Sequence, residues 1–404
     1  MRPAAGILSR AMRLTSSFAV FRTEPGEQDL SRARWLAREG RILPAEREYR
    51  EALTRHPDLV TGWMEVFELV RRDGRFEAAL AIAEQAQRHF GPDAAMPLAL
   101  RGAALAELGR VREAIGALEG ALERDGNLAL AWHELAYAAF RVGESSRALL
   151  ALDRAFALEP HTDTLMLRGR ILREAGQYEA ALVAFDAAMQ ASDHEIPQRE
   201  AQRESAATRR AASLGGRRPR EFSVRERLFA DTGAVVLVPQ PPVGPQLSLA
   251  LAAALGSLSG IARQVGWRPA AVAGAVADDA PLAASVAAAL DTQVVAAAAL
   301  DPADRPFVVT LVNGGTAELD RQTARLERWH TGVTFALIQV AGMVPSADIV
   351  GALCAPHAAP SALEAARLSL DHADVIASDA DEPARLAASA EAPWRRRQAE
   401  PGRL

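Results

Sequence analysis

A glycine recurs through the first half of the chain at nearly constant spacing, and this spacing constrains the fold more than any other feature. Gly40, Gly74, Gly109, Gly143 and Gly176 lie 34, 35, 34 and 33 residues apart. An alanine follows each glycine after five residues, and a second alanine follows seven residues later. Such a period is typical of a solenoid of helix-turn-helix units, in which small residues let two helices approach closely and the glycine forms the turn.

The repeated positions resemble the tetratricopeptide repeat (TPR) family, whose pattern is W-x2-L-G-x2-Y, then A-x3-F, then P. Trp63 and Trp132 lie eleven residues before their turn glycines, and Gly102 and Gly169 lie seven residues before theirs. The large position of the second helix holds Tyr49 in one repeat and Phe185 in another, and Pro57 and Pro160 close their repeats. The resemblance covers residues 26–195 and implies an α-helical TPR solenoid of about five repeats. The second half of the chain resembles no family.

The resemblance also implies where a ligand binds, because TPR ligands usually lie in a concave groove lined by the first helix of each repeat. The solvent-facing positions of these helices are predicted to be Arg34, Arg38, Met64, Glu68, Arg71, Arg72, Glu107, His133, Tyr137, Phe140, Arg141, Arg170 and Arg173. Seven arginines against two glutamates make this groove basic. Because a guanidinium pairs well with carboxylates, we expect a protein or peptide partner with acidic side chains or a free C-terminal carboxylate. The alternative is that these arginines only solvate an alanine-rich solenoid.

Composition excludes several classes of enzyme. None of the 46 basic residues is a lysine, so Schiff-base chemistry, a P-loop NTPase and an ordinary protein kinase are excluded. The use of arginine in place of lysine, together with the abundance of alanine, indicates a GC-rich genome and a bacterial source. The single cysteine, Cys354, rules out an internal disulfide and a cysteine-rich zinc site. We expect neither a metal nor a cofactor, and the net charge of -5 gives no reason to expect nucleic acid.

The two ends are predicted to lie outside the folded domains. Residues 1–25 are expected to be a flexible extension, because arginines interrupt any signal-peptide core, and no apolar run is long enough for a transmembrane segment. We therefore predict a cytoplasmic protein. Residues 377–404 are expected to be a mostly disordered tail, with docking of Trp394 on the second domain as the alternative.

An arginine-rich stretch separates the two halves. Residues 196–227 are predicted to form a capping helix, ended by Gly215, Gly216 and Pro219, and then a linker. Nine arginines and four glutamates lie between Arg199 and Arg227. A solvated linker is favoured because the stretch has a single aromatic residue, Phe222, and no known motif, and a contact with the acidic second domain, a membrane or nucleic acid is the alternative.

The second half changes from helical periodicity to short apolar runs alternating with helical stretches. This pattern predicts an α/β doubly wound, mostly parallel-sheet, Rossmann-like domain over residues 228–376. The strands are expected at Ala234–Val238, Ala270–Val276, Gln293–Ala297, Phe307–Val312 and Val333–Val340. The helices are expected at Leu247–Gln264, Pro281–Leu290, Glu318–Arg328, Ser346–Cys354 and Ser361–Leu370.

In such a sheet the ligand crevice lies beyond the carboxyl ends of the strands. The candidate crevice residues are Asp278, Asp279, Asn313, Gly314, Gly315 and Thr316. The Asn-Gly-Gly-Thr turn would present backbone N–H groups to a phosphate or carboxylate, although any strand-to-helix connection needs a similar turn. No G-x-G-x-x-G motif follows the first strand, which argues against a dinucleotide cofactor.

Catalytic constellations are scarce, so an enzyme is less favoured than a binding protein. Cys354 and His357 lie close in sequence, but no acid is placed to orient the histidine, and a structural cysteine is the commoner case. We therefore predict an adaptor or scaffold whose repeats bind a partner segment and whose α/β domain is a second interaction or ligand module. The alternative is a TPR-tethered transferase that binds a glycosyl or phosphoryl donor at the crevice. Nucleic-acid regulation through the arginine-rich linker ranks last.

Overall fold

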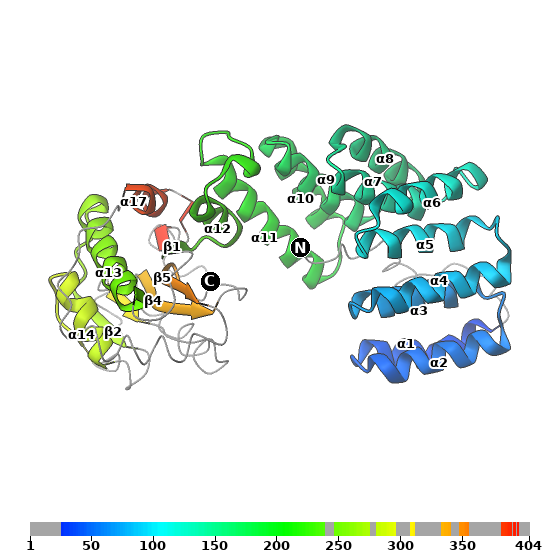
Figure 1. Cartoon of the computed structure of the whole chain (residues 1–404), viewed down its shortest axis with the longest axis horizontal. Helices are drawn as coiled ribbons and strands as arrows, with labels where there is room; N and C mark the ends of the chain where they lie inside the picture. The colour runs from blue at the N-terminus through cyan, green and yellow to red at the C-terminus, as the bar shows by residue number, and fades with distance from the viewer. Residues whose placement is uncertain are drawn as a thin grey trace. The chain divides into compact units, whose positions relative to one another are not determined.

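The computed structural model describes residues 26–238, 246–274, 280–295, 308–311, 333–340, 347–354, 381–389, 391–392 and 394–395. The chain divides into two compact units, Met1–Ser205 and Ala206–Leu404 (Figure 1). Each unit has buried hydrophobic clusters of its own.

The first unit is an array of five antiparallel helix pairs, which confirms the predicted helical solenoid. After a short 3-10 turn, η3 (Glu27–Asp29), the pairs are α1 (Leu30–Arg38) with α2 (Ile42–Arg55), α3 (Val60–Arg72) with α4 (Phe76–Phe90), α5 (Ala95–Glu107) with α6 (Val111–Arg124), α7 (Ala129–Arg141) with α8 (Ser145–Leu158), and α9 (Thr162–Glu174) with α10 (Tyr178–Gln190). Helix α11 (Glu195–Ala212) follows the last pair. The pairs stack in chain order in Figure 1.

The repeated small residues do what their spacing predicts. Each of the five turn glycines has a positive φ, between 71° at Gly40 and 85° at Gly143, which few side chains tolerate. The alanines that follow after five residues are fully buried in all five second helices. A Cβ at Gly102 would lie 2.5 Å from Leu118 Cγ, so the absence of a side chain is what lets α5 approach α6.

Equivalent positions also make equivalent hydrogen bonds. The indole Nε1 of Trp63 donates to the carbonyl oxygen of Pro57 at 2.8 Å, and that of Trp132 donates to the carbonyl oxygen of Gly126 at 2.8 Å. In both repeats the acceptor lies six residues before the tryptophan, in the loop that precedes the first helix. The tryptophan therefore fixes the connection between one repeat and the next.

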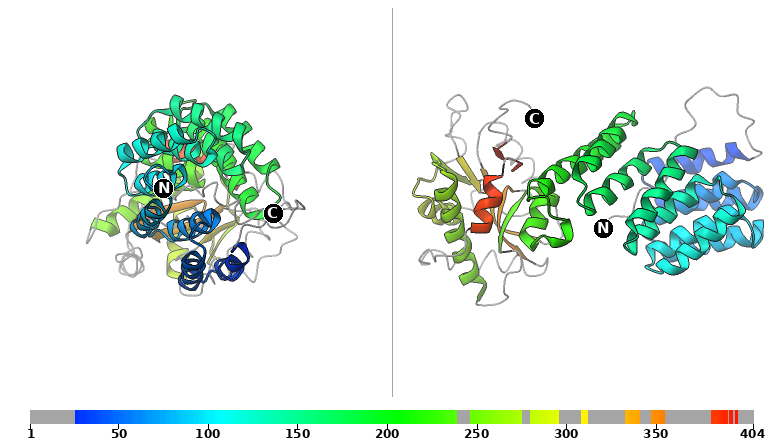
Figure 2. Two further views of the ribbon diagram at one scale, coloured as in Figure 1. Left: turned by 90° about the vertical axis from the view of Figure 1, so that its right-hand side faces the viewer. Right: turned by 90° about the horizontal axis from the view of Figure 1, so that it is seen from above.

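The first helices of the repeats lie on the inside of a curved array. Neighbouring first helices contact one another, α3 with α5, α5 with α7 and α7 with α9, whereas neighbouring second helices approach each other less. Figure 2 (left) shows successive helices following an arc. The face formed by the first helices is called the inner face below.

The second unit contains a parallel sheet with helices packed beside it. Its strands are β1 (Val235–Val238), β2 (Ala271–Gly274), β3 (Val308–Leu311), β4 (Val333–Val340) and β5 (Ile349–Cys354), in the order β1-β5-β4-β3-β2. Its helices are α12 (Val224–Thr232), preceded by the turn η4 (Pro219–Glu221), then α13 (Gln246–Val265), α14 (Ala280–Ala289) and α17 (Asp381–Ala388). All four strand pairings are parallel, for example with Val235 opposite Ile349 and Val309 opposite Val333.

Two of the predicted elements differ in the structure. The helix predicted at Ser346–Cys354 is wrong, because its residues from Ile349 onward form β5, which lies between β1 and β4. Ile349 and Val350 are fully buried there, as suits a strand covered on both faces. In the stretch predicted as a strand at Gln293–Ala297, the described residues form only an isolated bridge, between Val294 and Val272.

The doubly wound arrangement stays a prediction. The helices predicted at Glu318–Arg328 and Ser361–Leu370 would complete it, and both lie outside the described residues. What the structure shows is the coarser feature, a small parallel sheet with α13 against β1 and β5 and α14 against β2.

Asp348 ties three strands together at the amino-terminal edge of the sheet. Its Oδ2 accepts hydrogen bonds from the backbone N of Thr334 at 2.8 Å and from the Thr334 hydroxyl at 2.9 Å. The Thr334 hydroxyl in turn accepts a hydrogen bond from the backbone N of Asp348 at 2.9 Å. The carbonyl of Asp348 accepts from the backbone N of Val235, so the contacts join β4, β5 and β1.

The C-terminal stretch departs from the predicted disordered tail. Helix α17 packs on α12, α13 and β1. Its Ala384, Leu386 and Ala387 are buried and form an apolar face. Trp394 is 3% exposed and meets Trp267 edge-to-face, with ring centroids 5.2 Å apart. Docking of Trp394, the alternative reading of the tail, is what the structure shows.

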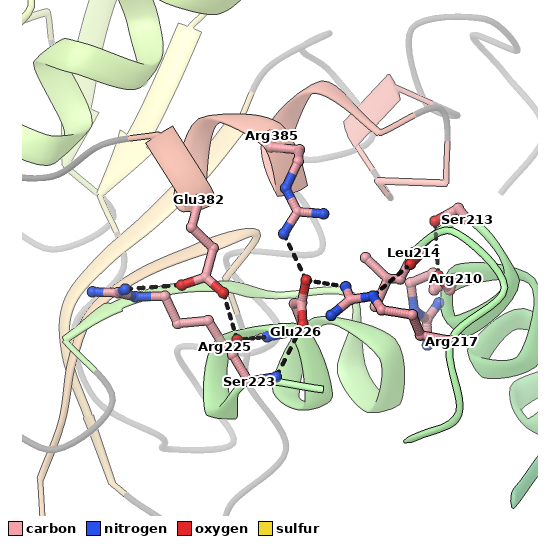
Figure 3. A network of polar contacts seen from close by, with 9 residues as sticks. All are labelled: Arg210, Ser213, Leu214, Arg217, Ser223, Arg225, Glu226, Glu382 and Arg385. Carbon is pink, nitrogen blue, oxygen red and sulfur yellow. Dashed lines mark hydrogen bonds and ion pairs between the residues drawn. The ribbon is translucent and has the colours of Figure 1, made fainter. Parts of the chain in front are cut away.

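Part of the arginine-rich stretch, from residue 206 onward, belongs to the second unit and makes contacts within it (Figure 3). Arg210 is buried and donates to the carbonyl oxygens of Phe229, Ala230 and Asp231, which are the last carbonyls of α12. The carbonyl of Phe229 also accepts from the backbone N of Gly233 at 2.7 Å. The last carbonyls of a helix otherwise lack partners within it, so a guanidinium that contacts three of them stabilises the end of α12.

Candidate functional site

The predicted groove residues lie on the inner face, but five of them are buried instead of solvent-facing. Arg34, Glu68, Arg71, His133 and Tyr137 each expose 7% of their surface or less. Their burial follows from the contact between first helices of neighbouring repeats. Those that keep half-buried or exposed surface are Arg38, Met64, Arg72, Glu107, Phe140, Arg141, Arg170 and Arg173.

At the N-terminal end of the inner face, Arg34 is held by two glutamates. Its Nε donates to both oxygens of Glu65, at 3.1 and 2.9 Å, and its Nη2 donates to Glu65 at 2.9 Å and to Glu27 at 2.5 Å. The hydroxyl of Tyr49 donates to Glu65 at 3.0 Å. Burial raises the pKa of Glu65, against the hydrogen bonds from Arg34 and Tyr49 that lower it. Arg34 therefore joins α1 to α3 and is not available to a partner.

In the middle of the array, Arg71 lies among three glutamates from three successive repeats. It donates to Glu68 on its own helix at 2.9 Å and to Glu134 of α7 at 3.1 Å, and it lies 3.8 Å from Glu107 of α5. To reach α7, the side chain of Arg71 crosses α5. Helix α5 carries several small buried residues, among them Ala103 and Ala106.

Burial controls the protonation of this cluster. The pKa of Glu134 is raised to about 7, mainly by burial, with Arg71 opposing the shift and the neighbouring Glu68 and Glu107 adding to it. Burial also raises the pKa of Glu107. The pKa of His133 is lowered to about 3 by burial and by the positive charge of Arg71, so its imidazole is neutral. The middle of the inner face is therefore a filled, buried ionic cluster.

At the C-terminal end of the array, α11 supplies the partners. Arg170 donates to Glu204 and Glu200, both at 2.8 Å, and Arg173 donates to Glu204 at 2.6 Å. The pKa of Glu204 is lowered, because the two arginines outweigh the effect of burial, which would raise it. These contacts fasten α11 onto the last helix pair.

The expected excess of positive charge on the inner face is thus largely cancelled. Among the residues predicted to line the groove, the sequence has seven arginines and two glutamates, Glu68 and Glu107. The structure brings five more carboxylates to the same arginines: Glu27, Glu65, Glu134, Glu200 and Glu204. The predicted groove did not include Glu65 and Glu134, although their position in the repeat could have indicated a buried polar role. Both lie nine residues before a turn glycine, where repeats three and five carry Leu100 and Leu167.

What remains exposed on this side is a row of arginines. Arg38, Arg72 and Arg141 all lie two residues before a turn glycine, and all three are exposed. Arg38 makes no hydrogen bond or ion pair with the residues that the structure describes. Arg72 donates to Glu68 at 2.6 Å, and Arg141 donates to the neutral hydroxyl of Tyr137 at 3.1 Å. Half-buried Met64 and Phe140 lie on the same helices as Arg72 and Arg141. We call these three arginines the arginine row.

Two small cavities of the array lie elsewhere, between the second helix of one repeat and the first helix of the next. One, of about 160 Å³, is lined by residues of α2, α3 and α4, including Trp63 and Ile82. The other, of about 270 Å³, is lined by residues of α8 and α9, including Phe156 and Leu165.

The predicted crevice cannot be placed. Asp278, Asp279, Asn313, Gly314, Gly315 and Thr316 all lie outside the described residues, as do His330 and His357. Cys354 ends β5. Within the described ranges, no group of three or more histidine, cysteine, aspartate or glutamate side chains is arranged to hold a metal ion. The same ranges contain no helix with the length and apolarity needed to cross a bilayer.

No family model matches the chain, and no curated protein matches its sequence. Several solved structures are similar to it. A thermophilic TPR protein of Thermus thermophilus is 17% identical with a TM-score of 0.40, over 44% of this chain and 98% of that one. The APC/C hetero-tetramer Cut9-Hcn1 is 18% identical with a TM-score of 0.41, over 56% of this chain and 44% of that one. YrrB, a TPR protein with an unusual peptide-binding site, is 19% identical with a TM-score of 0.29, over 49% of this chain and 99% of that one.

The five helix pairs, the period of 33 to 35 residues and the positive-φ glycine in every turn are those of a tetratricopeptide repeat array. Residues 26–195 form a TPR-like region. In the TPR-like region the accessible part of the inner face includes the arginine row and the half-buried Met64, Glu107, Phe140, Arg170 and Arg173.

Proposed function

We propose that this protein is an adaptor whose TPR-like region binds a segment of another protein along the inner face. Arrays of helix pairs present long, continuous surfaces, and protein interaction is the general role of such a repeat fold. The observation that carries the proposal is the arginine row. Arg38, Arg72 and Arg141 occur at the same position of three repeats, so a bound segment would meet a guanidinium at each of them.

The chemistry of the arginine row favours an acidic partner segment. Arg38 and Arg141 have no carboxylate within ion-pair distance among the described residues, so two of the three guanidinium charges are not neutralised by direct pairing within that part of the chain. An exposed guanidinium offers a planar fork of donors to a carboxylate, either an acidic side chain or a C-terminus. Phe140, which precedes Arg141, and Met64, which lies near the start of the helix that Arg72 ends, add half-buried apolar surface. Arg34, Arg71, Arg170 and Arg173 stay structural in this proposal.

The second unit serves in this proposal as a second ligand module. The transferase alternative rests on the crevice at the carboxyl ends of the strands, whose residues lie outside the described ranges. No observation on the described residues favours it over the adaptor.

The test reverses the charge of the arginine row in the full-length chain. We expect R38E/R72E/R141E to lose the proteins that the wild-type chain captures from a lysate of its native host, as measured by quantitative mass spectrometry. The matched control is R88E/R112E/R154E, which makes the same charge change at three exposed arginines on the second helices α4, α6 and α8. The control should retain the captured set. Equal capture by both triple variants would remove the arginine row from the interaction.

A further inference from the structure

The two ends of the TPR-like region are covered differently. At the C-terminal end, Arg170 and Arg173 hold α11 against the last helix pair through Glu204. At the other end, α1 and α2 form the first pair, and no helix of the described ranges is stacked beyond them (Figure 1). In the later repeats the first helix packs on the second helix of the repeat before it, for example α3 on α2 and α5 on α4. Helix α1 has no such neighbour among the described elements.

Trp35 lies on this open side of α1. It precedes the turn glycine by five residues, and it is 53% exposed. The residues at the same position of the later repeats are each 7% exposed or less: Leu69, Ala104, Ala138 and Ile171. The difference follows from the missing neighbour, because this position is buried wherever another repeat comes before it. A terminal repeat normally presents a polar outer face, whereas an exposed tryptophan is typical of the centre of a protein interface.

Two charges of opposite sign flank Trp35 on the same face of α1. Arg32 lies three residues before it and Glu39 four residues after it, which is the spacing of neighbours on one face of a helix. The side chain of Arg32 is 73% exposed, although its Nε lies 3.2 Å from Oε1 of Glu48, and a guanidinium has further N–H donors. Glu39 is exposed, and no ion pair joins it to another described residue. We call Arg32, Trp35 and Glu39 the α1 end face.

The order of charges on the α1 end face is complementary to itself. If two copies of α1 pair in antiparallel orientation about a two-fold axis near Trp35, Arg32 of each copy lies opposite Glu39 of the other. The two tryptophans then meet at the axis, and the ion pair occurs twice. The first repeat as a whole does not oppose this pairing, because residues 27–58 carry seven arginines and seven carboxylates. A second copy therefore supplies both the apolar contact and the charges that this face requires.

We propose that two copies of this chain associate through the α1 end face to form a two-fold homodimer. Trp35 anchors the interface, and the two Arg32–Glu39 pairs fix the antiparallel orientation of the helices. Helix α1 has only nine residues, so the interface is small. We therefore expect a reversible dimer with a dissociation constant on the order of micromolar, as is common for interfaces below the standard size.

The first test measures the mass of the full-length chain by sedimentation velocity over a range of concentrations. The wild type should change from monomer to dimer as its concentration rises to about 100 µM. Trp35→Ala should raise the dissociation constant about thirtyfold or more, as expected for a tryptophan at the centre of an interface. The matched control is Leu150→Ala on α8, which truncates another exposed apolar side chain, 68% exposed, and should leave the dissociation constant unchanged. Circular dichroism confirms that each variant is folded.

The second test exchanges the two charges of the α1 end face. Arg32→Glu and Glu39→Arg each place like charges opposite one another in the dimer, so each should weaken it about tenfold. The double variant R32E/E39R restores opposite charges and should recover most of the lost affinity, which a role within one chain does not explain, because the two positions lie seven residues apart on one helix.

Three outcomes overturn the proposal. If the wild type stays monomeric at the highest concentration, Trp35 belongs to another occupant, such as residues 1–25 of the same chain or a different protein. If W35A dimerises as tightly as the wild type, the α1 end face is not the interface. If R32E/E39R binds no more tightly than either single variant, the antiparallel pairing is wrong.

Discussion

Glycines in the TPR-like region differ in what their missing side chain does, and single substitutions should show opposite signs. A Cβ at Gly102 would lie 2.5 Å from Leu118, which is fully buried, and 3.2 Å from the carbonyl oxygen of Ala114. We expect Gly102→Ala to lower the free energy of unfolding by about 1–3 kcal/mol, because neither neighbour can retreat. Chemical denaturation with the far-ultraviolet circular dichroism signal measures the change.

Gly116, in the middle of α6, is the matched control. An added Cβ there meets nothing within 4 Å, and its backbone is helical. Gly116→Ala should therefore raise the free energy of unfolding by about 0.5–1 kcal/mol, because alanine loses less conformational entropy in a helix than glycine. If both variants destabilise the chain to the same extent, the close approach of α5 and α6 does not require a glycine at position 102.

Glu134 should make the stability of the chain depend on pH near neutrality. Its pKa rises from an ordinary value of 4.5 to about 7 in the folded chain, mainly because it is buried. The folded state thus holds a proton that the unfolded state has already released. This stabilisation is complete below about pH 4.5 and is lost as the pH rises through about 7, by an amount on the order of 3 kcal/mol.

Glu134→Gln tests this assignment, since glutamine keeps the shape and an oxygen acceptor for Arg71 but does not titrate. Thermal denaturation of the wild type between pH 4.5 and 7.5 should show a falling Tm over this window, and the variant should show a smaller fall. Parallel profiles for the two chains would mean that Glu134 ionises as an ordinary glutamate. The variant should also be more stable than the wild type above pH 7.

The role of single residues was predictable where it depends on position within a repeat. Gly102, Gly169 and the turn glycines follow from the period, because every repeat must bring two helices together in the same way. The partners of Arg71 do not follow, since Glu134 lies 63 residues away and belongs to a helix two repeats further along. The pairing appears only once three repeats are stacked, because it joins α3 to α7 with α5 between them in the array.

At the scale of elements, β1, β4 and β5 depend on the contacts of Asp348. Thr334 donates two buried hydrogen bonds to the carboxylate of Asp348. Removing this carboxylate leaves the backbone N–H and the hydroxyl of Thr334 without their acceptor. We expect Asp348→Ala to lower the free energy of unfolding of the second unit by about 1–3 kcal/mol, whereas Asp348→Asn, which keeps an oxygen acceptor, should cost less. Urea titration followed by the tryptophan fluorescence of this unit measures both. Equal costs for Ala and Asn would show that these hydrogen bonds do not hold the strands.

The elements of the second unit were harder to predict than those of the first. The strands β1 to β4 follow from short apolar runs, whereas β5 was predicted as a helix. A short apolar run carries no periodicity that separates a buried strand from a buried helix. The position of Ile349 and Val350 between two parallel strands is set by tertiary pairing, which the local sequence does not encode.

At the scale of the whole molecule, the charge of the predicted groove shows what a list of residues leaves out. The first helices were expected to present a basic surface, and several of their arginines were placed on the correct side of the array. The glutamates that neutralise them come from η3, from buried positions of the same helices and from α11. A net charge counted over one predicted face therefore overestimates the charge that a partner meets.

Each unit has its own hydrophobic core, and we expect the chain to unfold in two thermal transitions, one for each unit. The two core variants assign them. Gly102→Ala should lower the Tm of one transition, and Asp348→Ala should lower the Tm of the other, because each disturbs contacts inside a single unit. Differential scanning calorimetry of the full-length wild type and both variants resolves this. A single transition that both substitutions shift together would mean that the two cores melt as one cooperative structure.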